Sequence, residues 1–259
     1  MRHLMFMLPL FLSIAPALAE TSQEKGLAII VKQDQNNKGF KDYTNNMVMT
    51  LKDAQGNSAV RTLRAGGLEV EHDGDKSFMV FDTPADVKGT SILTQSHGVK
   101  NDDQWLFLPA VKRVKRLSSN NKSGPFMGSE FAYEDLSSPV VEKYTYNYLR
   151  EEKCAALQCH VIERTPKYEN SGYTRMVLWI DTKELRTFKI EYYDRKSSLL
   201  KTLNNSGYKL YLKKYWRAET GDMVNHQNGK STILVSSNFL FGVGLKTSDF
   251  EPEALDHLP

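Results

Sequence analysis

The sequence predicts a mainly β protein with a few helices, built on a single large curved antiparallel sheet. About ten or more short segments read as strands, and turn signals separate them. Residues 187–193 alternate apolar and polar side chains, which is typical of a strand with one wet face. Residues 176–180 are apolar without interruption, which indicates a strand buried on both faces. Because a sheet of this size curls, we expect it to enclose a concave face.

A short amphipathic helix is expected to precede the strands. Residues 21–24, Thr-Ser-Gln-Glu, form a capping-box pattern, and Leu27, Ile30 and Val31 follow with helical spacing. The helix should end near Gly39. Beyond it, the apolar residues recur at every second position, as in a strand, and no longer with helical spacing.

The strands then follow in order. Residues 47–51 and 60–68 predict a first hairpin around Gln55-Gly56-Asn57, and Asp73-Gly74 marks the next turn before a strand at 78–81 that is apolar on both faces. Further strands are expected at residues 91–95, 104–108, 111–117, 140–149, 160–164, 175–180, 187–193, 199–203, 209–216 and 231–236.

The stretch from residue 118 to residue 128 interrupts the series of strands. It is rich in Ser, Asn, Lys, Gly and Pro, so it predicts a loop, although the large apolar side chains of Phe126 and Met127 at its end need cover. Ser129 is expected to cap a short helix over residues 130–135, with acidic residues in its first turns.

The first 19 residues read as a signal peptide that is cleaved after Ala19. Arg2 supplies a positive charge, residues 4–14 are largely apolar, and Ala17-Leu18-Ala19 has the pattern of a cleavage site. No cysteine follows the cleavage point, and no later run approaches the roughly 18 apolar residues of a spanning helix. We therefore expect residues 20–259 to form an exported domain, with an uncleaved anchor helix or two smaller domains as the alternatives.

Charge and cysteine content restrict the classes of function. Removing Arg2 lowers the net charge from +3 to +2, with both signs well represented, which argues against nucleic-acid binding. Four residues separate Cys154 from Cys159 in an exported chain, which predicts a local disulfide. A redox pair would need two intervening residues, and a zinc site would need ligands besides His160.

No motif for catalysis, a cofactor or a metal is present. The chain lacks a Gly-x-Ser-x-Gly elbow, a Walker loop and a His-Glu-x-x-His pair, and its six histidines are scattered. Glu69, Glu71, Asp73 and Asp75 are interpreted as a solvated hairpin end rather than an acid/base pair or a calcium site. We expect no enzyme activity, no cofactor and no metal.

The densest basic run leaves two readings open. It consists of Lys112, Arg113, Lys115 and Arg116, and it follows an apolar stretch ending at Pro109. Basic side chains on an edge strand prevent edge-to-edge aggregation. They also suit contact with anionic lipid headgroups or an acidic partner, including a transient contact with a membrane surface.

Long strings of residues resemble a known family. Residues 103–116, DQWLFLPAVKRVKR, and 126–136, FMGSEFAYEDL, closely resemble the LolA-like outer membrane lipoprotein-sorting proteins of bacteria, and residues 173–180, 192–196 and the closing FGVG of 241–244 extend the likeness. The resemblance implies an unclosed half β-barrel plugged by helices, with an apolar cavity for the acyl chains of lipid or lipoprotein. It also implies a periplasmic carrier that accompanies an RND or MMPL-type exporter.

Three functions compete, and they differ in the site that each requires. A non-enzymatic lipid or lipoprotein carrier is the first, a periplasmic lipid-sensing regulatory protein that binds a membrane partner is the second, and a hydrolase of envelope lipids is the third. The carrier needs an apolar cavity. Candidates for its lining are Phe78, Val80, Trp105, Phe107, Phe126, Met127, Phe131, Trp179, Phe188 and Ile190.

Overall fold

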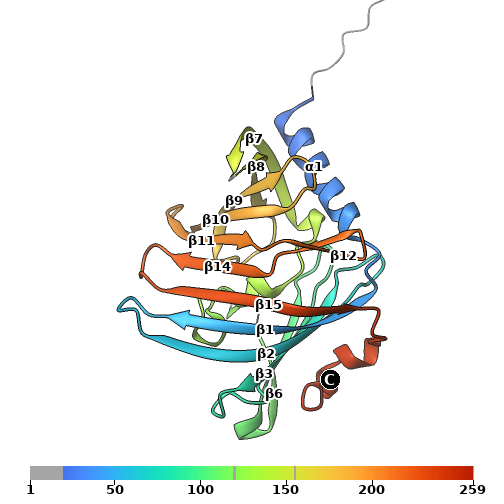
Figure 1. Ribbon diagram of the computed structural model, residues 1–259, viewed down its shortest axis with the longest axis vertical. Helices are drawn as coiled ribbons and strands as arrows, with labels where there is room; N and C mark the ends of the chain where they lie inside the picture. Colours follow the sequence, from blue (N-terminus) through green and yellow to red (C-terminus); the bar gives the residue numbers. More distant parts are fainter. Residues whose placement is uncertain (1–19, 119–120, 155, 259) are drawn as a thin grey trace, which may run out of the picture.

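One open antiparallel sheet organises the protein. The computed structural model describes residues 20–118, 121–154 and 156–258. Thirteen strands are joined in the order β6-β5-β4-β3-β2-β1-β15-β14-β11-β10-β9-β8-β7, and the end strands β6 and β7 do not pair with each other. Figure 1 shows the resulting curved sheet. The predicted mainly β fold with an unclosed sheet is confirmed, whereas the predicted signal peptide lies outside the described residues.

Most strands lie close to the positions that the sequence predicts for them. They are β1 (Asp42–Lys52), β2 (Ser58–Leu68), β3 (Lys76–Thr83), β4 (Ser91–Gln95), β5 (Asp103–Leu108), β6 (Arg113–Arg116), β7 (Tyr144–Cys154), β8 (Leu157–Pro166), β9 (Tyr173–Asp181), β10 (Thr187–Asp194), β11 (Leu199–Ser206), β12 (Lys209–Tyr211), β13 (Tyr215–Arg217), β14 (Thr220–Asn225) and β15 (Ser231–Phe241). Short 3₁₀ helices span Pro109–Val111, Phe126–Gly128, Tyr133–Leu136, Val141–Lys143, Thr247–Phe250 and Pro252–Ala254.

The helix α1 (Ser22–Asn37) begins at the predicted capping box. The Thr21 hydroxyl accepts a hydrogen bond from the Glu24 backbone N–H, while the Glu24 carboxylate accepts one from the Thr21 backbone N–H at 2.8 Å. The helix lies against β7 at one end of the sheet (Figure 1). Among the described residues, no helix is long and apolar enough to span a membrane.

The chain between the two sheet edges crosses the inside of the curve. Strand β6 is one edge and β7 is the other, so the connection between them must traverse the open side of the sheet. We call its described part, residues 121–143, the plug segment. Its Phe126 packs with the core of β1 to β5 and its Phe131 packs with the core of β8 to β10, while Leu234 contacts both cores. These contacts define the inner face of the sheet.

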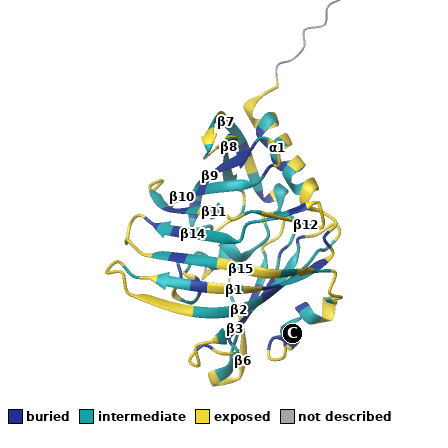
Figure 2. Ribbon diagram, viewed as in Figure 1, coloured by how far each residue is buried: buried dark blue, intermediate teal, exposed yellow. Residues whose placement is uncertain are grey.

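The opposite, outer face is also covered at both ends of the sheet. The C-terminal residues Phe250 and Leu255 pack on Phe78 of β3, whereas Val177 and Trp179 of β9 pack on Cys159. Figure 2 shows β9 as one of the most deeply buried strands. Burial on both faces explains why residues 78–81 and 176–180 are apolar without alternation.

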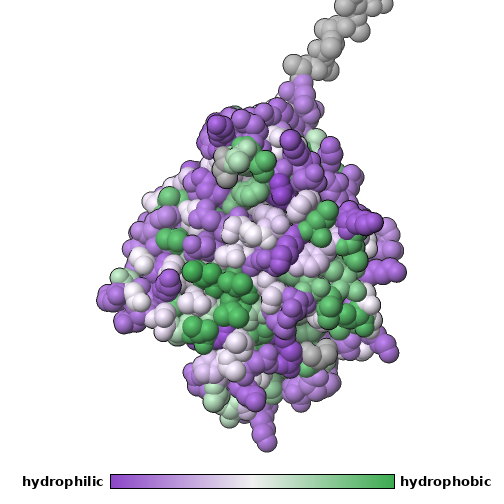
Figure 3. All heavy atoms as spheres, in the orientation of Figure 1, coloured by the Kyte–Doolittle hydropathy of each residue, from purple (hydrophilic) through white to green (hydrophobic). Residues whose placement is uncertain are grey.

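The middle of the outer face is left open. Val48, Val60 and Val235 are 39%, 54% and 41% exposed, and Val48 and Val235 are direct register partners on β1 and β15. Figure 3 shows hydrophobic side chains gathered over this part of the sheet. The inner side chains of the same strands, including Met49, are buried against the plug segment.

Two local predictions for the segment between β6 and β7 are wrong. Residues 129–132 are not helical: Phe126 N–H donates to the Phe131 carbonyl at 2.7 Å, and the 3₁₀ helix Tyr133–Leu136 follows. Asp135 caps Ala132 N–H at 2.7 Å, which starts this turn later than Ser129 predicted. Similarly, residues 141–143 form a 3₁₀ turn before β7 begins at Tyr144.

The predicted strand at 209–216 is a hairpin instead. Leu212 and Lys213 have positive φ values of 49° and 56°, so the chain reverses there and β12 pairs with β13 in a separate two-stranded sheet. Strand β14 was not predicted, since Thr220–Asn225 contains only two large apolar residues, Met223 and Val224. It pairs on both sides, with β11 and β15.

Candidate functional site

The plug segment is held to the sheet by buried polar contacts. Lys201 of β11 places its ammonium 2.6 Å from the Asp135 carboxylate, and the same ammonium donates to the Glu130 carbonyl at 2.8 Å. The Tyr173 hydroxyl of β9 donates to Asp135 at 2.9 Å. Because side chains from two strands converge on one carboxylate, this part of the plug segment is fixed relative to the sheet.

A second group of contacts fixes the plug segment to a loop. Gly172 N–H donates to the Glu134 carboxylate at 2.7 Å, and the hydroxyls of Ser171 and Tyr168 donate to it at 2.9 and 3.2 Å. Burial is the main cause that raises the pKa of Glu134, although the donors oppose it. Lys143 pairs with Asp102 at the other end of the plug segment.

A cavity of about 560 Å³ lies between the C-terminal half of α1, strands β7 to β9 and residues 138–141. Its apolar lining comes from Ile30, Val141, Tyr146, Leu178 and Leu185. Four of these residues are core residues of the inner face and the fifth, Val141, packs against them. The volume falls in the range of about 300–1,000 Å³ that is usual for ligand sites.

Most of the other residues that line this cavity are polar, and the cavity continues into two neighbouring spaces. Spaces of about 470 Å³ and 230 Å³ share Asn37, Asp75 and Ser138 with it. Asp75 belongs to the acidic cluster that the sequence places at a solvated hairpin end. It is instead half-buried, and burial raises its pKa to about 6, with nearby Glu69 adding to the shift. Glu69 itself accepts backbone hydrogen bonds from Gly39 and Lys41.

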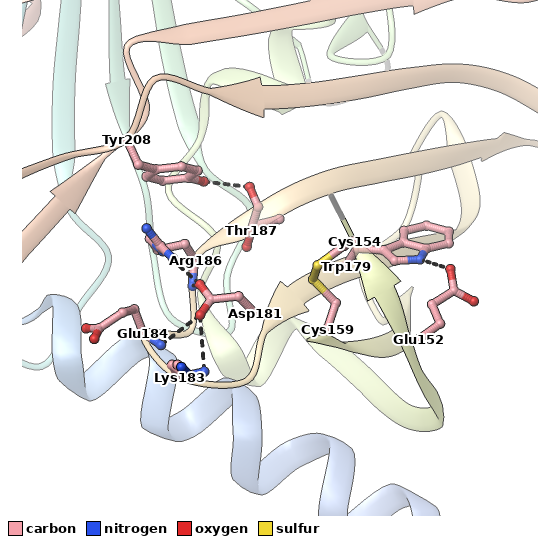
Figure 4. Close-up of a disulfide and its surroundings, with 10 residues drawn as sticks. All are labelled: Glu152, Cys154, Cys159, Trp179, Asp181, Lys183, Glu184, Arg186, Thr187 and Tyr208. Atoms are coloured by element: carbon pink, nitrogen blue, oxygen red, sulfur yellow. Dashed lines mark hydrogen bonds and ion pairs between the residues drawn. A yellow bond between two sulfur atoms is a disulfide. The ribbon is translucent and has the colours of Figure 1, made fainter. Parts of the chain in front are cut away.

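Arg186 separates this cavity from a groove on the outer face. Its guanidinium donates to the Asp181 carboxylate at 2.8 Å and lies over the Trp216 ring at 4.6 Å (Figure 4 shows the pair with Asp181). The outer groove, of about 590 Å³, is lined by Trp179 and Phe188. It also contains Cys154, whose predicted disulfide with Cys159 is confirmed (Figure 4).

The ten residues predicted to line a cavity are divided between the two faces. Those on the inner face are Phe126, Met127, Phe131 and Ile190, and those on the outer face are Phe78, Val80, Trp105, Phe107, Trp179 and Phe188. None of the ten lines the cavity beside α1. Phe126 is fully buried among core side chains, and Phe78 lies under the C-terminal segment.

Phe188 and Ile190 were expected to share one face of a strand. A β-bulge between Thr187 and Lys189 breaks the alternation, so Phe188 packs with Trp179 outside while Ile190 packs inside. A bulge adds one residue to a strand and reverses the side-chain parity on either side of it. The expected pairing of these two residues is therefore wrong.

Sequence reasoning missed the residues that line the inner cavity. Ile30 was assigned to the apolar stripe of α1, and Leu178 was assigned to a buried run, but neither was placed at a site. Arg164 also lines this cavity, with its guanidinium 4.7 Å from the centre of the Tyr144 ring. Because side chains two positions apart in a strand point to the same face, Arg164 could have been placed on the same face of β8 as Ile162.

The basic run lies on the edge strand β6 and on the turn before it. Lys112 adopts a left-handed conformation, with φ of 47°, and the residues from Lys112 to Arg116 are exposed. Arg116 pairs with Asp103 and lies over the Trp105 ring at 5.8 Å. The run therefore covers an open sheet edge, and its role in contacting a headgroup or partner stays a prediction.

No group of three or more His, Cys, Asp or Glu side chains that could hold a metal ion occurs within residues 20–118, 121–154 and 156–258.

Comparison with known proteins identifies the family. A family model described as "Uncharacterized protein" matches residues 73–257. The crystal structure of an outer membrane lipoprotein-sorting protein domain from Vibrio parahaemolyticus is 52% identical, with a TM-score of 0.89, over 91% of this chain and 100% of that one. The chain belongs to the outer membrane lipoprotein-sorting protein family.

Two further solved structures share the fold of this lipoprotein-sorting family member. A DUF1329 family protein from Desulfovibrio piger is 30% identical, with a TM-score of 0.86, over 91% of this chain and 99% of that one. A LolA superfamily protein from Nitrosomonas europaea is 22% identical, with a TM-score of 0.70, over 90% and 98% of the two chains, and shows the shared fold alone. No curated protein matches the chain.

Proposed function

We propose that the protein is a periplasmic, non-enzymatic carrier that binds the acyl chains of lipid or lipoprotein in the cavity beside α1. The cavity itself is the observation that carries this proposal. Its apolar lining includes Leu178 and Leu185, and none of the side chains that the structure describes fills it. An acyl chain of about 15 methylenes costs roughly 12 kcal/mol to expose to water, so carriage across an aqueous compartment requires such a shield.

The surroundings of the cavity suit a carrier. One wall is the sheet, which the buried contacts of the plug segment hold in shape, and the other is α1, which is joined to the sheet by few polar contacts. Gln33 of α1 donates to the Leu185 carbonyl and to the Thr187 hydroxyl at 3.0 Å, and Arg217 donates to Asn37 at 2.7 Å. Because few polar contacts join α1 to the sheet, we expect this wall to move aside to admit a ligand.

The location and the partners of the carrier are part of the same proposal. Cleavage after Ala19 would release the protein into the periplasm, where an RND or MMPL-type exporter would deliver or receive the lipid. The basic run at Lys112, Arg113, Lys115 and Arg116 would then make a transient contact with the membrane surface, because it is exposed on the edge strand β6.

Tryptophan quenching by a brominated fatty acid tests which face of the sheet binds the acyl chain. Trp216 lines the inner cavity, Trp179 lines the outer groove, and Trp105 lies beneath the C-terminal segment. Three variants, each retaining one of these tryptophans and carrying Phe at the other two, separate their signals. Bromine quenches only indoles that it approaches closely.

We expect the brominated acid to quench the variant that retains Trp216 and to leave the variant that retains Trp105 unchanged. The latter is the matched control, since it reports on an apolar pocket that the chain already fills. Quenching of Trp179 alone would move the site to the outer groove. Absence of quenching in all three variants, at concentrations that saturate other acyl carriers, would refute the carrier proposal.

A further inference from the structure

Arg164 carries a charge that no carboxylate among the described residues balances. It projects from β8 onto the inner face, where Ile162 of the same strand is part of the core, and it lines the cavity beside α1. Its Nε and Nη2 donate to the Met176 Sδ at 3.3 Å each. Among the residues that the structure describes, no Asp or Glu lies within ion-pair distance of its guanidinium.

The groups around Arg164 are poor substitutes for an anion. A thioether sulfur is a weak acceptor, and a guanidinium has five N–H donors, so the two bonds to Met176 leave most of them available. The guanidinium lies over the Tyr144 ring and is near enough to Tyr146 to interact with it electrostatically, but burial raises the pKa of Tyr146, so its hydroxyl stays neutral at pH 7. Desolvated charges in proteins are normally paired.

Neighbouring arginines show the usual arrangement. Arg186 is paired with Asp181 at 2.8 Å, and Arg175 on the outer face of β9 is paired with Glu163 at 3.2 Å while it lies over Tyr193. Arg175 and Arg164 both stack on a tyrosine, and only Arg175 has a carboxylate. The unpaired state of Arg164 is therefore a local property of the cavity.

The rest of the cavity wall also favours an anion. Arg217 donates to the Asn37 side chain at 2.7 Å and to the Trp216 carbonyl at 3.0 Å, and neither acceptor carries a charge. On the acidic side of the wall, Asp34 is already paired with Lys38 at 2.9 Å. Asp75, whose pKa burial raises to about 6, keeps most of its charge at pH 7 and loses it as the pH falls through about 6.

We propose that the cavity beside α1 binds an amphiphile with one acidic headgroup, a carboxylate or a phosphate, and that Arg164 binds that headgroup while Ile30, Leu178 and Leu185 contact the acyl chain. The planar fork of the guanidinium matches either oxyanion with two parallel hydrogen bonds. This inference rests on the proposed carrier function, since it names the class of lipid for the same site.

The test compares ligands that differ only in the headgroup. Delipidated protein is titrated with palmitate, with hexadecanol as the uncharged analogue, and with inorganic phosphate as the anion without a chain. A charge-assisted pair in a desolvated site predicts that palmitate binds at least about tenfold more tightly than hexadecanol. Inorganic phosphate should not compete with palmitate at millimolar concentration.

Three variants assign the preference to Arg164. Arg164→Gln should bind palmitate and hexadecanol equally, with the affinity for hexadecanol unchanged, whereas Arg175→Gln should retain the preference of the wild type. Arg164→Lys keeps the charge without the fork and should retain part of the preference. If Arg164→Gln fails to fold, Arg164→Lys takes its place: a weaker preference for palmitate supports the role of Arg164, and an unchanged preference overturns it.

The outcomes separate this inference from the carrier function. Equal affinity of the wild type for palmitate and hexadecanol would overturn the role of Arg164 and leave the carrier intact. Binding of neither would contradict the carrier function itself. Competition by inorganic phosphate would overturn the proposal that the ligand is an amphiphile and would indicate a site for a free anion.

Discussion

The ammonium group of Lys201 lies 2.6 Å from the carboxylate of Asp135, and both side chains are almost fully buried, with 4% and 5% exposed. Lys201 belongs to β11, whereas Asp135 belongs to the plug segment, which is distant from β11 in the sequence. The pair therefore connects the inside of the curved sheet to the chain that crosses it. It also keeps the plug segment in place next to a cavity that needs a stable wall.

Replacing Lys201 with Met should destabilise the fold by about 3–5 kcal/mol, because it leaves the Asp135 carboxylate buried without a counter-charge. The double variant Lys201→Met/Asp135→Leu should recover part of this loss. Urea unfolding measures both. Lys209→Met, which removes an exposed pair with Glu219, is the control and should leave the midpoint nearly unchanged. A single variant as stable as this control would show that the buried pair does not hold the plug segment.

Replacing Gly26 with Val should displace α1 from the sheet. A Cβ at Gly26 would lie 2.9 Å from the backbone N of Tyr148, so a larger side chain forces the helix away from β7. We expect a loss of about 1–3 kcal/mol in unfolding free energy and weaker binding of a fatty acid. Ala28→Val, on the exposed side of α1, controls for the helix propensity of valine. Equal behaviour of the two variants would argue against α1 as a wall of the site.

Replacing Asp75 with Asn should stabilise the protein at alkaline pH. Burial raises the folded-state pKa of Asp75 to about 6, above its ordinary value of 3.8. The folded state thus binds this proton more tightly than the unfolded state does. The corresponding stability is present below about pH 4 and is lost as the pH rises through about 6.

Asn keeps an acceptor for the Val70 N–H, which is 3.2 Å from Asp75 Oδ1. We therefore expect the variant to exceed the wild type by about 1–2 kcal/mol at pH 8, after allowance for solvent screening, and to match it at pH 4. Urea midpoints across this range measure the difference. A difference that does not change with pH would show that Asp75 titrates normally.

Reducing the disulfide between Cys154 and Cys159 should weaken the protein without unfolding it. The bond closes a short loop between β7 and β8, which in the chain-entropy model contributes about 2 kcal/mol. Thermal melting with a reductant should lower Tm by roughly 4–8 °C for a chain of this size. Cys154→Ser/Cys159→Ser should melt at the reduced temperature with or without the reductant. Complete unfolding on reduction would contradict this local role.

Local signals in the sequence predicted much of the sheet. The capping box at Thr21 and Glu24 marks the start of α1, and strand β4 coincides with the predicted residues 91–95. These elements depend on interactions between residues close in the chain, which a sequence pattern records. The disulfide was predicted for the same reason, because its cysteines are near neighbours in the sequence.

The plug segment and the cavity depend on contacts that no local pattern records. Glu134 is held by residues 168–172, and Asp135 is held by Lys201, so the turns of the plug segment follow distant partners rather than helix propensity. Arg164 was missed because alternation along a strand shows which side chains share a face but not which face is concave. The bulge at Phe188 then reversed that alternation within β10.

Native mass spectrometry of the protein purified gently from the periplasm, with extraction of the bound lipid, tests the central claim most directly. The account predicts one acyl lipid per chain, bearing a carboxylate or phosphate headgroup, that is depleted in Arg164→Gln and retained in Arg175→Gln. A mass equal to that of the chain alone, even after incubation with envelope lipids, would contradict the carrier function and favour a protein that senses the envelope by binding a membrane partner.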